Sequence, residues 1–150
     1  MTVSDIPGYA EKREGLLPIA SKLAALDPEV LKSLEVPKVH YGIGWSHGKE
    51  QFQGIPDLSK GSYYANPEYD TPSKNTEGVY HPNVWPREHL PELEGAFKTL
   101  GREVCRIGYL LSIRIDRFIE YNCRDYPEGL FTHLLKNGKN HLARLLHYFP

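Results

Sequence analysis

Histidine is the residue type in this sequence best suited to bind a metal ion or transfer a proton, and the 150 residues contain seven of them. His141 and His147 stand six positions apart in an apolar run that has the length of a β-strand. At about 3.3 Å per residue they would lie about 20 Å apart, whereas bonds from a metal to its ligands are only about 2 Å long. Two further pairs lack the spacing of ligands on one turn of a helix: His40 with His47, and His81 with His89. We therefore predict no metal site built within this chain.

The loop from residue 40 to residue 50 contains two other patterns that can be mistaken for sites. Gly42-x-Gly44 is similar to a fragment of a phosphate-binding loop, but the Gly-Lys-Ser/Thr of such a loop does not follow it. Ser46 directly precedes His47, and sequence neighbours seldom reach the geometry of a catalytic triad. The Gly-x-Ser-x-Gly turn of hydrolases is also missing around this serine. We expect neither phosphate binding nor hydrolysis at this loop.

Charge and composition exclude several classes of function. The sequence has 18 basic and 19 acidic residues, so no overall positive field favours nucleic acid or an anionic membrane. We find no signal-peptide pattern and no run of about 18 apolar residues, and we expect a cytoplasmic protein. The two cysteines, Cys105 and Cys123, would lie roughly 27 Å apart on one helix, too far for a disulfide, and are expected to be reduced thiols.

The elements that must position these side chains begin with an N-terminal helical region, residues 1–37. Its apolar residues predict one helix to about Ala25. Asp27-Pro28 is typical of a helix start and predicts a second helix through Leu34. The following Val36-Pro37 ends it, because the residue before a proline is driven away from helical geometry.

Residues 90–140 contain the clearest element, a long amphipathic helix to about residue 124 with Pro91 in its first turn, followed by a short helix over residues 128–136. Basic residues on the opposite face of the long helix favour a solvated surface over an anion-binding stripe. Those residues are Lys98, Arg102 and Arg106. The apolar stripe consists of Leu93, Phe97, Leu100, Val104, Ile107, Leu111, Ile115 and Phe118.

Between these regions, residues 38–89 predict a long irregular arm. It is too rich in tyrosine and tryptophan for a disordered linker, so we expect it to pack on a surface. Residues 141–150 predict one strand. The best partner within the chain is Lys38–Ile43, which glycine interrupts, so we expect the other members of the sheet to be missing. The expected fold class is mainly α (α+β), a single truncated domain.

Three segments carry a resemblance to a known family. GSYYANPEYDTP (residues 61–72) and HPNVWP (residues 81–86) precede the long helix, and RLLHYFP closes the chain. In this order they resemble the N-terminal portion of isopenicillin N synthase and the related non-haem iron dioxygenases, over about residues 38–150. The resemblance implies that residues 141–150 form the first strand of a truncated jelly-roll (double-stranded β-helix) core.

In that family, Fe(II) is held by a His-x-Asp pair and a distal histidine, an arrangement that leaves positions open for 2-oxoglutarate or substrate and for oxygen. These ligands, and the Arg-x-Ser pair that grips 2-oxoglutarate, follow the RLLHYFP-like strand and lie beyond residue 150. The resemblance therefore implies no catalytic residue and no bound cofactor in this chain. Fe(II) would belong to the full-length protein, with its small-molecule substrate.

The resemblance also places a few residues of this chain near the pocket. Tyr41, Trp45 and Tyr63 would lie near the substrate, and His147 and Phe149 near the cosubstrate. Many relatives have Asn-Tyr-Tyr-Pro where this chain has His147-Tyr-Phe-Pro150. Because Phe149 has no hydroxyl to donate, the use of 2-oxoglutarate stays open.

The function expected from the sequence is that of the N-terminal region of a non-haem iron(II) oxygenase-like protein, inactive alone because the iron-binding half is missing. Two alternatives remain. The chain could be a non-catalytic binding or regulatory module, or it could pair with a second chain that supplies the iron half.

Overall fold

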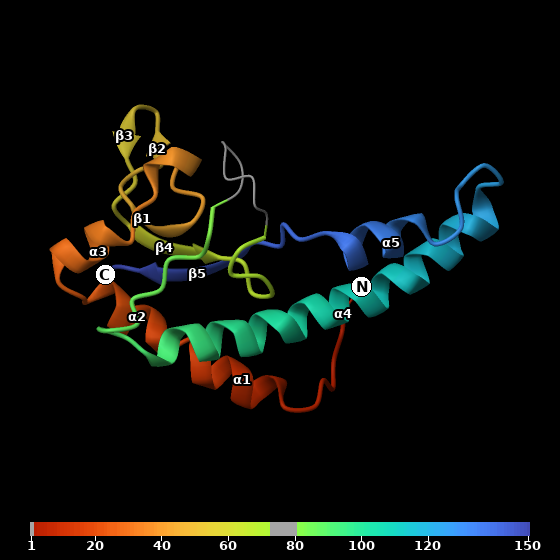
Figure 1. Cartoon of the computed structure of the whole chain (residues 1–150), viewed down its shortest axis with the longest axis horizontal. Coiled ribbons are helices and arrows are strands. Elements are labelled where there is room, and N and C mark those ends of the chain that lie inside the picture. Colours follow the sequence, from red (N-terminus) through yellow and green to blue (C-terminus); the bar gives the residue numbers. More distant parts are fainter. Residues whose placement is uncertain (1, 73–80) are drawn as a thin grey trace.

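The structure is a computed structural model that describes residues 2–72 and 81–150, and it mixes helices with a small antiparallel sheet (Figure 1). Residues 73–80 of the expected arm lie outside the described residues. The helices are α1 (Tyr9–Leu16), α2 (Ile19–Ala24), α3 (Pro28–Ser33), the 3₁₀ helix η1 (Pro37–Val39), α4 (Glu92–Asn122) and α5 (Leu130–Asn137). The strands are β1 (Gly44–His47), β2 (Gln51–Phe52), β3 (Ile55–Pro56), β4 (Lys60–Ala65) and β5 (Ala143–Tyr148).

The N-terminal region contains three α-helices where the sequence predicted two. The prediction of one continuous helix to about Ala25 was wrong, because α1 ends at Leu16 and α2 starts at Ile19. Pro18, at the break, has no N–H to donate, and its ring conflicts with the preceding turn of a helix. The predicted start of α3 is confirmed, since the Asp27 side chain accepts a hydrogen bond of 2.8 Å from the backbone N–H of Glu29.

The terminal strand has its partners within the chain. β5 pairs antiparallel with β4, which pairs antiparallel with β1, giving the order β1-β4-β5. The expectation that the partner strands of residues 141–150 are missing from this chain was therefore wrong, whereas the absence of further core strands stays a prediction. The expected partner Lys38–Ile43 is a 3₁₀ helix and a turn. β4 escapes sequence analysis because it contains a glycine and a serine and has buried residues on both faces, so its apolar residues do not alternate.

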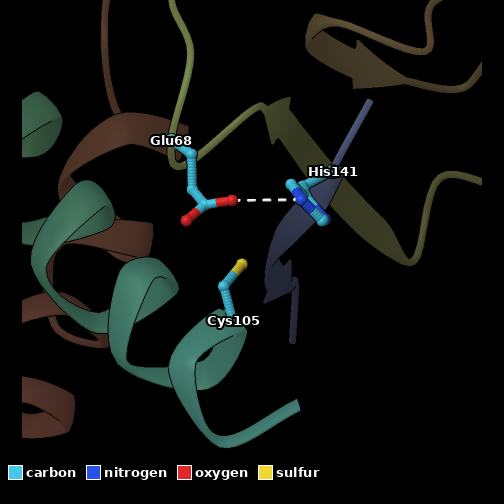
Figure 2. Close-up of side chains that lie close together, drawn as sticks. All are labelled: Glu68, Cys105 and His141. Carbon is cyan, nitrogen blue, oxygen red and sulfur yellow. Dashed lines mark ion pairs between the residues drawn. The ribbon is translucent and has the colours of Figure 1, made fainter. Parts of the chain in front are cut away.

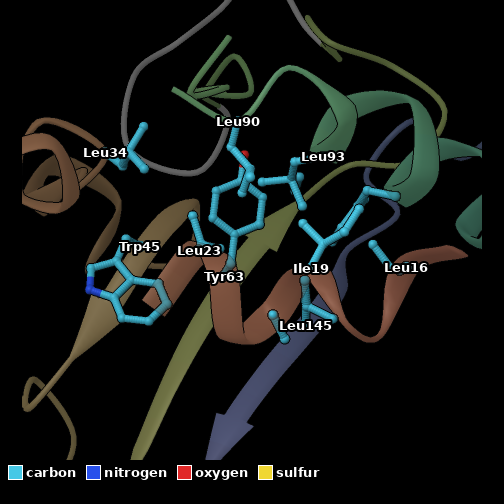
Figure 3. Close-up of a cluster of buried hydrophobic side chains, with 12 residues drawn as sticks. Leu16, Ile19, Leu23, Leu34, Trp45, Tyr63, Leu90, Leu93 and Leu145 are labelled. Atoms are coloured by element: carbon cyan, nitrogen blue, oxygen red, sulfur yellow. The ribbon is translucent and has the colours of Figure 1, made fainter. Parts of the chain in front are cut away.

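The core lies between the sheet and the helices. Trp45, Tyr63 and Leu145 stand opposite one another on β1, β4 and β5 and are at most 4% exposed. Figure 3 shows the Tyr63 ring pointing toward Leu90 and Leu93 at the start of α4. The buried cluster consists of Leu16, Ile19, Ala20, Leu23, Leu34, Trp45, Tyr63, Ala65, Leu90, Leu93, Phe97 and Leu145.

The long helix α4 confirms the predicted element, but only part of its apolar stripe is buried. Leu93 and Phe97 enter the core, whereas Ile115 and Phe118 are 37% and 70% exposed. Figure 1 shows why: the C-terminal half of α4 extends beyond the sheet, with α5 alongside it. The apolar stripe of α4 is therefore buried where the helix packs on the core next to the sheet, and it is partly exposed where the helix extends beyond the sheet.

Buried polar groups join α5 to α4. Asp116 of α4 is 3% exposed, and its carboxylate accepts hydrogen bonds from the backbone N–H groups of Phe131 (3.0 Å) and Thr132 (2.7 Å). These N–H groups belong to the first turn of α5, where a helix has no internal acceptors for them. Asp116 thus caps α5 from a neighbouring helix and fixes where the chain turns back toward β5.

Candidate functional site

Trp45 and Tyr63, which the resemblance places near a substrate, lie in the core of this chain. Tyr63 is fully buried, its hydroxyl donates to the carbonyl of Val84 at 2.6 Å, and burial raises its pKa above the ordinary value. Its ring packs against Trp85 and Phe97. Both predicted pocket residues therefore support the sheet here, and contact with a ligand stays a prediction.

Tyr41 lies apart from these two, in the turn that follows η1. It adopts a left-handed backbone conformation with φ of 60°, and the Lys49 ammonium lies 4.9 Å from the centre of its ring. This contact is a cation–π interaction at a half-buried position.

His147 and Phe149, the predicted cosubstrate neighbours, are brought together at the end of β5. The Phe149 ring lies 4.8 Å from the His147 ring and 4.7 Å from the His47 ring, measured between centroids. Gly61 of β4 stands between the two histidines in the register of the sheet, and its missing side chain leaves room for the Trp45 ring. The result is an aromatic cluster at one end of the sheet.

The strongest cluster of chemically competent side chains lies elsewhere. Its members come from the loop after β4, from α4 and from the segment before β5. Glu68, Cys105 and His141 each offer one donor atom, and these three atoms lie within 4.8 Å of one another. Figure 2 shows the sulfur of Cys105 pointing toward the other two side chains. Nε2 of His141 lies 3.1 Å from Oε2 of Glu68, and both side chains are half-buried.

His141 can reach this cluster because it precedes β5 and is not part of the strand. The sequence placed His141 on the strand, but the strand begins at Ala143. That prediction was wrong: residues 139–142 form an irregular segment between α5 and β5. The direction of the His141 side chain is therefore not set by the alternating side-chain pattern of the strand. Its imidazole lies near Cys105 of α4.

Asn66 holds both ends of the cluster. Its carboxamide oxygen accepts hydrogen bonds from the backbone N–H groups of Glu68 and Tyr69, both at 2.9 Å. Its amide group donates to the carbonyl of Lys139 at 2.7 Å, two residues before His141. Asn66 is itself 3% exposed, so one buried side chain sets the position of two chain segments.

The third member is positioned by close packing. Cys105 lies on α4 one turn after Gly101, and a Cβ atom at Gly101 would overlap the ring of Pro67. Only glycine lets the loop that carries Glu68 approach the helix this closely. Nε of Arg102 then donates to the carbonyl of Pro67 at 3.2 Å, which fastens the loop to α4.

The cluster lines an open cavity of about 510 Å³ between α4, α5 and the loop after β4. Burial raises the pKa of the Cys105 thiol, and the nearby carboxylate of Glu68 raises it further. The rim carries the cations Arg102, Arg106 and Lys136. A thiol, an imidazole and a carboxylate facing one cavity are suited to holding a transition metal ion or exchanging a proton.

The sequence prediction of no metal site considered histidine pairs and did not consider this trio. Its members come from a loop, a helix and an irregular segment that are far apart in the chain. The available signal was indirect: an asparagine–proline turn before Glu68 and a glycine one helical turn before Cys105.

Comparisons with protein-family models, with curated proteins and with solved structures found no match for this chain. Among the described residues, no helix combines the length and the apolar character needed to cross a membrane.

Proposed function

We propose that this chain is the N-terminal framework of a non-haem iron(II) oxygenase-like protein that acts on a small molecule. In this role the sheet and α4 support a catalytic core whose iron ligands come from another part of the protein. The proposal rests on the order of the motifs in the sequence. Its main structural support is an apolar flank on the C-terminal half of α4.

Ile115 of α4 and Leu130, Phe131 and Leu134 of α5 line one open apolar hollow. With Phe118, which follows Ile115 by one turn of α4, they make up this apolar flank, and each is at least 36% exposed. Apolar residues that repeat along one helix and remain in water are typical of a surface that another part of a protein covers. Among the described residues, β5 is also an edge strand of its sheet, a position at which a further strand can be added. Both features suit a framework that a larger core completes.

The described residues do not fit the iron of that family. Two histidines and one carboxylate hold Fe(II) there, whereas the three-donor cluster found among residues 2–72 and 81–150 contains a cysteine and a single histidine. His147 and His47 both pack against Phe149. We therefore assign no oxygenase step to this chain, and we expect it to be inactive alone.

A second candidate function, a non-catalytic binding module, is favoured by a different observation. β5 is fully paired with β4 along Ala143–Tyr148, and the core between sheet and helices includes residues from both ends of the chain. Such a chain can fold without a further partner for its terminal strand.

The intact mass of the endogenous protein, isolated with an antibody against this chain, distinguishes the two functions. A framework of a larger oxygenase predicts a mass well above the 17.1 kDa of this sequence, or a stable complex with a second chain. An endogenous monomer of about that mass contradicts the framework proposal and favours the module.

A turnover assay complements the mass. With Fe(II), 2-oxoglutarate, ascorbate and oxygen, the chain alone should form no more succinate than the reaction without protein. Succinate formation that disappears in His147→Ala would show that the iron chemistry resides in this chain and would overturn the proposal.

A further inference from the structure

We propose that Glu68, Cys105 and His141 form a binding site for a divalent transition metal ion of the zinc type. The site would leave one coordination position open toward the cavity between α4 and α5. It is independent of the proposed function, since it needs neither the family's iron ligands nor any residue beyond this chain.

The distances fit a single ion. A tetrahedral zinc ion with bonds of about 2.0–2.3 Å keeps its donor atoms roughly 3.3–3.8 Å apart. The imidazole nitrogen and the carboxylate oxygen are already 3.1 Å apart, and all three donor atoms lie within 4.8 Å of one another. The donor atoms would therefore have to move by only about 1 Å to reach tetrahedral spacing.

The donor set also selects the kind of metal. Thiolate and imidazole bind zinc and cobalt in preference to magnesium or calcium, which require oxygen ligands. A deprotonated Cys105 and the Glu68 carboxylate contribute two negative charges, which balance the two positive charges of the ion. The pairing of His141 with Glu68 already places the imidazole nitrogen and the carboxylate oxygen toward one point.

The scaffold fixes two of the three donors in advance. Asn66 ties the loop of Glu68 to the segment of His141, and the Gly101–Pro67 contact brings that loop onto the helix one turn before Cys105. Buried supports of this kind raise metal affinity, because little freedom is lost when the ion binds.

The positive rim determines what occupies the fourth position. Arg106 is paired with Glu103, and Arg102 donates to the carbonyl of Pro67, but both keep their charge beside the cavity. With Lys136 they favour hydroxide or a small carboxylate over a neutral ligand at the open position.

Cobalt and zinc titrations of the metal-free chain test the site. Co²⁺ should give one bound equivalent with the visible absorption of a four-coordinate ion and a thiolate-to-cobalt charge-transfer band. Competition with a chromogenic chelator measures the zinc affinity. Cys105→Ser should abolish the charge-transfer band, and Cys105→Ser and His141→Ala should each weaken zinc binding by at least about 10–100-fold.

Cys123→Ser is the matched control, because Cys123 is the other free cysteine and is exposed. It should bind both ions as the wild type does. A band that survives in Cys105→Ser, or that is lost in Cys123→Ser, overturns the proposal, as does a wild-type chain that binds no zinc.

A second measurement does not depend on variants. X-ray absorption of the zinc-loaded wild type should show one sulfur neighbour among nitrogen and oxygen neighbours. Two sulfur neighbours or none overturn the site. Neither result affects the oxygenase framework, which the mass of the endogenous protein tests separately.

Discussion

The amide of Asn66 donates a hydrogen bond of 2.7 Å to the carbonyl of Lys139, which lies 73 positions later in the chain. This bond joins the turn after β4 to the segment before β5. It brings Glu68 and His141 together although they lie on different segments, so the candidate site depends on a buried side chain that is not itself a metal donor.

Replacing Asn66 with alanine should lower the free energy of unfolding by about 2–3 kcal/mol. The change leaves two backbone N–H groups and one carbonyl, all in part-buried hydrogen bonds, without their partner. Urea unfolding followed by circular dichroism measures the effect. Asn122→Ala is the control, since its exposed side chain bonds only within its own helix turn, and it should change stability by less than about 0.5 kcal/mol. Equal effects of the two variants would contradict the role of Asn66.

Two glycines of α4 should respond to alanine in opposite directions. Gly101→Ala should destabilise the fold by about 1–3 kcal/mol, because the new methyl group overlaps Pro67. Gly95→Ala meets no atom within 4 Å and should stabilise the helix by about 0.5–1 kcal/mol. Thermal unfolding of both variants provides the comparison. Stabilisation by Gly101→Ala would show that the loop does not pack closely on the helix.

Asp70 should contribute stability that depends on pH. Partial burial acts to raise the pKa of Asp70, but hydrogen bonds from Lys98, Trp85 and Asn83 outweigh burial and lower the pKa to about 2. A folded-state pKa below the unfolded value of about 3.9 gives stability that is fully present above that value and is lost as the pH falls through about 2.

Asp70→Asn should therefore reduce stability by about 1 kcal/mol at pH 6 and have little effect near pH 2. This figure is smaller than the pKa shift alone implies, because the side chain is 44% exposed and solvent screens its contacts. Urea unfolding from pH 2 to pH 7 measures the difference from wild type. Asp125→Asn, at an exposed position, serves as the control. A difference for Asp70→Asn that does not vary with pH would contradict the assignment.

The apolar flank of α4 and α5 should bind hydrophobic dyes. Phe118→Glu should lower the fluorescence of 8-anilinonaphthalene-1-sulfonate while changing stability by less than about 0.5 kcal/mol, because Phe118 is 70% exposed. Phe97→Ala, in the core, should instead cost about 3–5 kcal/mol. A large loss of stability in Phe118→Glu would mean that the flank is already covered in this chain.

The long helix could be predicted because a sustained period of three to four residues is unambiguous over 31 residues. The break between α1 and α2 could also have been predicted, because Pro18 interrupts the hydrogen bonding of a helix. β4 was not, since Gly61 and Ser62 carry little strand propensity and their burial depends on the Trp45 ring and on the neighbouring strands.

The Glu68, Cys105 and His141 cluster is a property of the tertiary structure. No local spacing joins its members, and the start of β5 at Ala143 decides where His141 points. Periodicity locates elements, but it does not predict which irregular segments meet on a helix.

The framework proposal is tested most directly by sequencing the native transcript beyond the codon for Pro150. The proposal predicts either an open reading frame with a His-x-Asp pair after one further strand, followed by a distal histidine, or a second transcript that encodes this iron half for a partner chain. A continuing frame without such a pair, or a stop codon with no partner that carries one, would contradict it and leave a non-catalytic module.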